Sequence, residues 1–199
     1  MKWIILLVAV SACAGENDAA RLDHPRILAV RATPAHALPG QPVRVDVLAG
    51  DSSGTVIETA PDRVTAAGVA PERRSDGWYV AAAQPVVPVE VELAIDGELL
   101  RASKQLVFGD HADNPIVATM QVDGSDADAI VTEVGATRTL SAAATDVGFA
   151  WYSSIGTLDH DRSAQPTFTS DERGDGIVLV VVRDTQGGVA WQQLPVTID

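Results

Sequence analysis

The residue whose chemistry is most constrained by its neighbours is Cys13, the single cysteine of the chain. It follows a basic Met1-Lys2 start and an apolar run from Ile4 to Val10. This order is typical of a secretory signal, and the run is too short to span a bilayer. A disulfide is excluded because no second cysteine exists, and a buried free thiol is disfavoured because Cys13 precedes any plausible core. The alternative to a modified thiol is an ordinary cleaved signal with an incidental cysteine.

The histidines and serines form no catalytic or zinc-binding pattern. The sequence contains neither the Gly-x-Ser-x-Gly turn of a serine hydrolase nor the His-x-His or His-Glu-x-x-His spacing of a zinc site. The histidines are scattered through predicted loops, at His24, His36, His111 and His160. We therefore predict that the protein is not an enzyme and that it has no cofactor other than a covalent group on Cys13.

Acidic turns supply oxygen ligands of the kind that calcium prefers. One turn holds Asp123, Asp126 and Asp128 together with Ser125, and a second set comprises Asp159, Asp161, Asp171, Glu172 and Asp175. Neither set fits the Asp-x-Asp-x-Asp-Gly loop with its distal glutamate. In an acidic protein such turns are also typical of ordinary solvated loops, so they are calcium candidates and no more.

The segment from Ile177 to Val182 is apolar at every position, whereas a strand of a sandwich needs only one buried face. On the last strand Leu194, Val196 and Ile198 share one face, which leaves Trp191 on the other. Two interpretations follow. A bulge near Pro195 turns Trp191 inward and loops cover the rest, or an exposed patch docks another protein. In the second case the partner surface consists of Trp191 with Val178, Val180 and Val182.

Composition limits the partners. The formal net charge is −13, which disfavours nucleic acid and electrostatic binding to anionic lipid head groups. Hydrophobic residues make up 46% of the chain but aromatic residues only 5%, so the core is expected to consist of Val, Leu, Ile and Ala. Stability must come from apolar burial, without a disulfide.

The apolar pattern is that of β-strands throughout. Val43–Val47 and Val89–Ile95 alternate apolar and polar residues with period two. Asp96-Gly97 then predicts a tight hairpin leading into 98–108. A second hairpin is expected from Ile177–Val182 to Val189–Ile198, and an aromatic strand at 149–152.

The two halves of the chain share this layout. We predict a signal peptide at 1–12, a flexible tether at 13–24, a first domain at 25–109, a linker at 110–115 and a second domain at 116–199. Each half has about seven short strands and no helical period. The fold class is therefore all-β, with two tandem immunoglobulin-like sandwiches.

The residues Val10-Ser11-Ala12-Cys13 resemble the lipobox of bacterial lipoproteins. The resemblance implies a diacylglycerol on the Cys13 thiol, removal of residues 1–12 and acylation of the new amino terminus. Three acyl chains hold a protein on its membrane stably. Ala14 follows the cysteine in place of aspartate, which in this family favours transfer to the outer membrane.

The chain resembles bacterial immunoglobulin-like and PKD-like modules over most of residues 25–199, more closely in the second half. The resemblance is carried by Trp151-Tyr152-Ser153-Ser154-Ile155-Gly156, Pro166-Thr167-Phe168 and Val180 to Gly188 with its Asp-x-x-Gly-Gly ending. It implies that Trp151 is the core tryptophan of the third strand, strand C. Such modules act as spacers, adhesins and accessory subunits alike.

These features together predict a non-enzymatic, lipid-anchored protein of the cell envelope. It is expected to be a structural or accessory subunit, or an adhesive module, of an outer-membrane assembly. Its partners would be the membrane, through the lipid, and another envelope protein. The alternative is an extracytoplasmic module that binds a glycan or binds its ligand through calcium.

Overall fold

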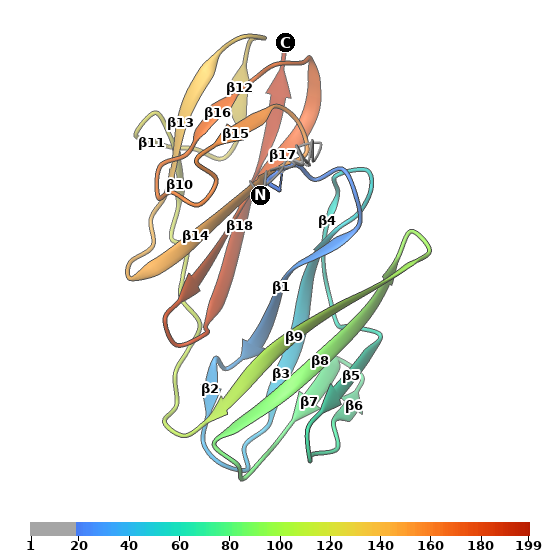
Figure 1. Cartoon of the computed structure of the whole chain (residues 1–199). Helices are drawn as coiled ribbons and strands as arrows, with labels where there is room; N and C mark the ends of the chain where they lie inside the picture. The colour runs from blue at the N-terminus through green and yellow to red at the C-terminus, as the bar shows by residue number, and fades with distance from the viewer. Residues whose placement is uncertain (1–18) are drawn as a thin grey trace, which may run out of the picture.

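The computed structural model describes residues 19–199, and the predicted signal peptide, Cys13 and the first part of the predicted tether lie outside this range. Residues 19–199 form β-strands and connecting turns, without helices (Figure 1). This part of the chain therefore contains no helix that is long and apolar enough to cross a membrane. The predicted all-β class is confirmed.

The first half builds two facing sheets. One has the order β1-β3-β7-β6, with β4 also paired to β3. Its strands are β1 (Arg26–Thr33), β3 (Val43–Gly50), β4 (Val56–Thr59), β6 (Glu72–Arg74) and β7 (Gly77–Val80). The other sheet has the order β2-β9-β8-β5, where β2 runs parallel to β9. It consists of β2 (His36–Ala37), β5 (Arg63–Ala66), β8 (Val86–Ile95) and β9 (Glu98–Phe108).

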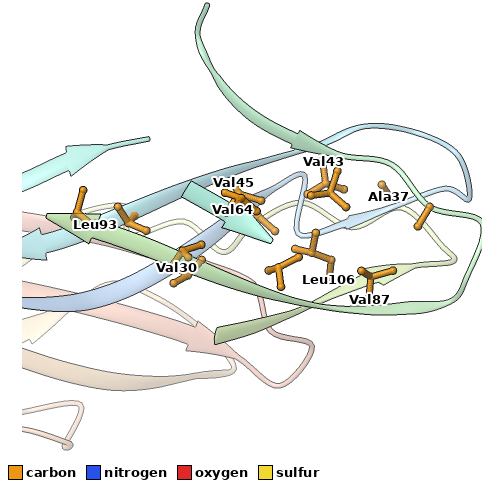
Figure 2. Packing of buried hydrophobic residues seen from close by; sticks show 14 of the residues in the cluster. Val30, Ala37, Val43, Val45, Val64, Val87, Leu93 and Leu106 are labelled. Atoms are coloured by element: carbon orange, nitrogen blue, oxygen red, sulfur yellow. The ribbon is translucent and has the colours of Figure 1, made fainter. Parts of the chain in front are cut away.

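Period-two alternation places the core between these sheets. Alternate residues of β8 are buried and exposed along the strand, as the sequence predicts. Val45 and Leu106 are fully buried and belong to one cluster that joins both sheets (Figure 2). The hairpin between β8 and β9 turns at Asp96 and Gly97, whose φ angles of 50° and 81° are the left-handed conformation that such two-residue turns require.

The second half repeats the arrangement. One sheet has the order β12-β18-β17-β14, with β12 parallel to β18, and the other has the order β11-β10-β13-β16-β15. The first consists of β12 (Ile130–Thr132), β14 (Val147–Ser153), β17 (Gly174–Asp184) and β18 (Val189–Ile198). The second consists of β10 (Met120–Val122), β11 (Ser125–Asp126), β13 (Thr137–Ala142), β15 (Thr157–Asp159) and β16 (Thr167–Thr169). In both halves the last strand lies between a short parallel strand and its hairpin partner, which is an immunoglobulin-like order.

Trp151 on β14 fills the core of the second sandwich. Its side chain is fully buried beside Phe168 and Leu140, and its indole Nε1–H donates to the carbonyl of Ser163 at 3.0 Å. A buried tryptophan needs such a partner for its one polar group. The predicted role of Trp151 as the core tryptophan of this strand is confirmed.

The segment before β1 differs from the predicted flexible tether. Ala20 and Leu22 are buried, and the backbone pairs with Ser153 on β14: Leu22 N–H donates to Ser153 O at 2.7 Å, and Ser153 N–H donates to Ala20 O at 2.9 Å. Arg21 adds a hydrogen bond to the carbonyl of Gly156 at 2.7 Å and an ion pair with Glu172. The chain thus docks on the second sandwich before it enters the first.

Candidate functional site

The three valines of the predicted partner surface lie inside the second sandwich. Val178, Val180 and Val182 have no exposed surface and pack with Leu194 in its core. They are therefore not available to an external partner, and this part of the predicted surface is corrected. The physical reason is the alternation of side chains along β17: the even-numbered residues face the opposite sheet of the second sandwich, and the odd-numbered residues face away from it.

The other face of β17 is covered by the first sandwich. Leu179 and Val181 are buried against Leu28 and Ala29 of β1 and Leu48 of β3, in a cluster that spans both halves of the chain. A bulge in β1 between Ile27 and Ala29 adds Leu28 to this face. Both apolar faces of β17 thus have partners within the chain, and the second face joins the two sandwiches.

Trp191 lies at the rim of this interface and is partly buried. The guanidinium of Arg31 stacks on its ring with 4.0 Å between the guanidinium carbon and the ring centroid. The indole Nε1–H donates to Glu58 Oε2 at 3.1 Å, and Glu58 also forms an ion pair with Arg31. Strands β17 and β18 pair without a register shift, so the bulge predicted near Pro195 does not occur. Trp191 instead contacts the neighbouring sandwich.

Polar contacts surround the apolar interface. The first sandwich binds the turn between β17 and β18 through His36, whose Nε2–H donates to the carbonyl of Gln186 at 2.8 Å. Asn114, between the two sandwiches, donates to the carbonyl of Ala32 at 2.7 Å and accepts from Val189 N–H at 2.8 Å. These bonds fix the orientation of the sandwiches.

Beside these contacts the interface opens into a recess of about 300 Å³. Residues 27–30 of β1 and 102–104 of β9 line one side, and Arg183, Asp184, Gly187 and Val189 line the other. Lys104 Nζ donates to the carbonyl of Gly187 at 2.5 Å, and Arg183 donates to the carbonyl of Leu28 at 2.6 Å. Ligand sites are found preferentially at domain interfaces of this kind.

The two cations of the recess differ from most arginines of the described chain, which pair with carboxylates. Within residues 19–199, neither Lys104 nor Arg183 has a carboxylate in ion-pair range. Burial lowers the pKa of the Lys104 ammonium, and the nearby Asp184 carboxylate opposes this. The recess therefore carries two cations against one anion, in a chain with a net charge of −13.

Sequence reasoning missed Lys104 as a site residue. Leu100, Ala102, Leu106 and Phe108 pack in or against the core of the first sandwich. Lys104 occupies the same face of β9, where alternation predicts an apolar residue. The sequence signal that could have identified it is a lysine at a position where the period-two pattern predicts an apolar, core-facing residue.

The acidic turn proposed for calcium has its carboxylates engaged elsewhere. Asp123 accepts from Arg138 Nη1 at 3.1 Å and from the backbone N–H of Thr139 at 2.9 Å. Asp126 accepts from Gln121 at 2.9 Å. Over residues 19–199, no three side chains from His, Cys, Asp and Glu are grouped so that they could hold a metal. Asp123, Asp126 and Asp128 are thus not brought together as ligands.

Arginines lie over the partly buried rings of Trp78 and Tyr79 and over the buried ring of Tyr152. Guanidinium carbons lie 5.4 Å from the Trp78 ring centroid, 4.2 Å from that of Tyr79 and 5.2 Å from that of Tyr152, in addition to the pair at Trp191. The indole of Trp78 also packs against the core and donates to the carbonyl of Pro61. These rings are stacked on cations and are not free platforms for a sugar.

Comparison with known proteins identifies no family. No protein-family model and no curated protein matches the sequence. Three solved structures illustrate what the fold is similar to. The N-terminal Ig1-2 module of the Drosophila receptor protein tyrosine phosphatase DLAR is 12% identical, with a TM-score of 0.37 over 88% of this chain and 99% of that one. Fibronectin(III)-like modules of Clostridium thermocellum CbhA are 12% identical, with a TM-score of 0.34 over 88% and 94% of the two chains.

The third is a nucleoside hydrolase-related hypothetical protein from Saccharophagus degradans, which is 16% identical with a TM-score of 0.34. That match covers 43% of this chain and only 26% of the other. At TM-scores this low the matches carry no argument about activity. The assignment of two immunoglobulin-like sandwiches rests on the strand pairing described above.

Proposed function

We propose that this protein is a non-enzymatic, lipid-anchored component of the cell envelope that binds another envelope protein as an accessory or adhesive subunit. The observation that carries the proposal is the position of Cys13, which ends a lipobox-like signal and stands six residues before Ala19, where the described chain begins. Six extended residues reach about 20 Å. A lipid on Cys13 would therefore hold the folded body next to its membrane.

The place where the chain leaves the folded body determines which part faces the membrane. Residues 20–22 are docked on β14 of the second sandwich, close to where the first sandwich packs against it (Figure 1). An anchor attached here is close to both sandwiches.

The interface between the sandwiches supports a role in assembly. It combines an apolar cluster with hydrogen bonds at its rim, so the two sandwiches present their outer surfaces in one fixed arrangement. A protein that bridges or positions partners needs such a fixed geometry, whereas a flexible spacer does not. We infer an outer-membrane location from Ala14 after the cysteine, as in the lipoprotein family.

The alternative of a glycan-binding or calcium-dependent module has less support. Stacking on a sugar requires a free aromatic face, and arginines occupy the candidate rings. Calcium binding requires converging carboxylates, and those of Asp123 and Asp126 already accept other hydrogen bonds.

Replacing Cys13 by alanine tests the anchor. In the native host, the parent protein is expected in the membrane fraction and the Cys13→Ala protein in the soluble fraction, because without acyl chains the acidic body has no affinity for lipid. Metabolic labelling with radioactive palmitate should mark only the parent. Ala14→Ser, which leaves the cysteine intact, is the matched control and should remain membrane-bound. Equal membrane retention of Cys13→Ala would overturn the anchor.

A further inference from the structure

Strand β9 has a long unpaired edge. It pairs with β8 along its whole length, from Glu98 to Val107. On its other side, only Val107 and Phe108 pair with β2. Between Glu98 and Leu106, no strand within residues 19–199 is hydrogen-bonded to this side. Such an edge is a template for an added strand unless the protein blocks it.

The register of the hairpin shows which backbone groups face this edge. Ile95 and Glu98 close the two-residue turn, so they form a hydrogen-bonded pair, and such pairs alternate with non-hydrogen-bonded ones. Two observations agree with this alternation. Phe108 N–H donates to Pro85 O, as expected for a hydrogen-bonded pair, and Pro88, which has no N–H, lies opposite Gln105 in a non-hydrogen-bonded pair. The N–H and C=O groups that point away from β8 therefore belong to Leu99, Arg101, Ser103 and Gln105.

The open edge borders the recess that holds Lys104 and Arg183, which donate to backbone carbonyls and have no carboxylate in ion-pair range within residues 19–199. Residues 102–104 of β9 line the recess, together with Arg183 and the turn between β17 and β18. The one carboxylate nearby, that of Asp184, already accepts the backbone N–H groups of Gln186 and Gly188, both at 2.8 Å. Lys104 and Arg183 are thus positioned to receive a carboxylate from outside, beside backbone groups that can receive a strand.

We propose that the edge of β9 from Leu99 to Gln105 accepts an extended segment of the partner protein as an added strand, and that a carboxylate of this segment binds Lys104 and Arg183. The inference rests on the proposed function, because it specifies the partner. Main-chain hydrogen bonds would supply affinity and the carboxylate would supply selectivity, as in other strand additions.

A second copy of the chain is a poorer occupant. From Leu99 to Phe108 strand β9 contains Arg101 and Lys104 and no acidic residue. Pairing two β9 edges would therefore bring like charges together and leave the recess without a carboxylate. Lys104 could also serve only to protect the edge, because an inward-pointing lysine on an edge strand hinders strand pairing with other chains. The test has to distinguish these cases.

Site-specific photocrosslinking in the native envelope locates the contact. The full-length lipidated protein carries the photoreactive residue p-benzoylphenylalanine at position 103, on the β9 edge, or at position 65, on β5 at the opposite edge of the same sheet. We expect position 103 to crosslink a different protein through a segment that contains Asp, Glu or a chain end, and position 65 not to crosslink it. A crosslink to a second copy, equal crosslinking at both positions or no crosslink at position 103 would overturn the inference.

The crosslinked segment is then synthesised as a peptide, with a version in which amides replace its carboxylates, and titrated against the purified full-length protein. Ser103→Pro removes an edge N–H and keeps the fold, and it should weaken binding about tenfold. Lys104→Met should weaken binding to a similar degree, whereas Arg101→Met, which removes a cation paired with Glu92 on the solvent-facing side of β9, should change it less than twofold.

The peptide in which amides replace the carboxylates should bind the parent protein as weakly as the carboxylate peptide binds Lys104→Met. Unchanged affinity in Lys104→Met, combined with self-association, would mean that the lysine only protects the edge and would overturn the inference. A membrane protein partner that is captured without a contact at position 103 would refute the strand addition alone and leave the proposed function standing.

Discussion

Replacing Val181 by aspartate is expected to separate the two sandwiches and to lower the free energy of unfolding by about 3–5 kcal/mol, because a carboxylate would be buried without a partner. Val181 has no exposed surface, and it faces the first sandwich instead of the core of the second. Urea unfolding followed by circular dichroism should change from one cooperative transition in the parent to two in the variant.

Val131→Asp is the matched control, because Val131 is 67% exposed on the edge strand β12. This change should alter the free energy of unfolding by no more than about 0.5 kcal/mol. If Val181→Asp were as stable as Val131→Asp, the face of β17 that carries Leu179 and Val181 would not be packed against the first sandwich.

The second large effect concerns the core. Trp151→Ala should lower the free energy of unfolding by about 3–5 kcal/mol, since it leaves a cavity in the second sandwich and deprives the carbonyl of Ser163 of its donor. The midpoint of urea denaturation measures this loss. Trp191→Ala is the comparison, and it should cost clearly less because Trp191 is only partly buried at the rim. Equal losses for the two tryptophans would contradict the placement of Trp151.

The fold followed from local signals. Alternation in β8 and the Asp96-Gly97 turn involve residues close in sequence, so they predicted the first hairpin in the correct register. Trp151 was assigned to the core through the resemblance to known modules, and it is buried as expected. In each case the physical cause lies within one sandwich, where one buried face per strand is the rule.

The role of the second face of β17 was not predictable from the sequence. Apolar residues at every position show that both faces are buried, but they do not show what covers each face. The covering residues, Leu28 and Leu48, lie more than a hundred positions earlier in the chain. The same pattern would have arisen from an external partner, which is why a docking surface was predicted there.

The docked tether and Lys104 were missed for a different reason. Ala20 and Leu22 are two apolar residues in alternation, too few to predict a strand from the sequence. Their backbone groups nevertheless pair with those of Ser153. Lys104 is a single charged residue on a face of β9 that otherwise packs apolar side chains in or against the core. Signals of one or two residues acquire meaning only when the surrounding surfaces are known.

The measurement that tests the proposed function most directly is a crosslinked pull-down of the full-length protein from its native envelope, beside Cys13→Ala. We expect one envelope protein in stoichiometric amount with the parent, and its loss when the anchor is removed. A parent protein that is membrane-bound yet recovered alone would contradict a role as a subunit of a membrane assembly.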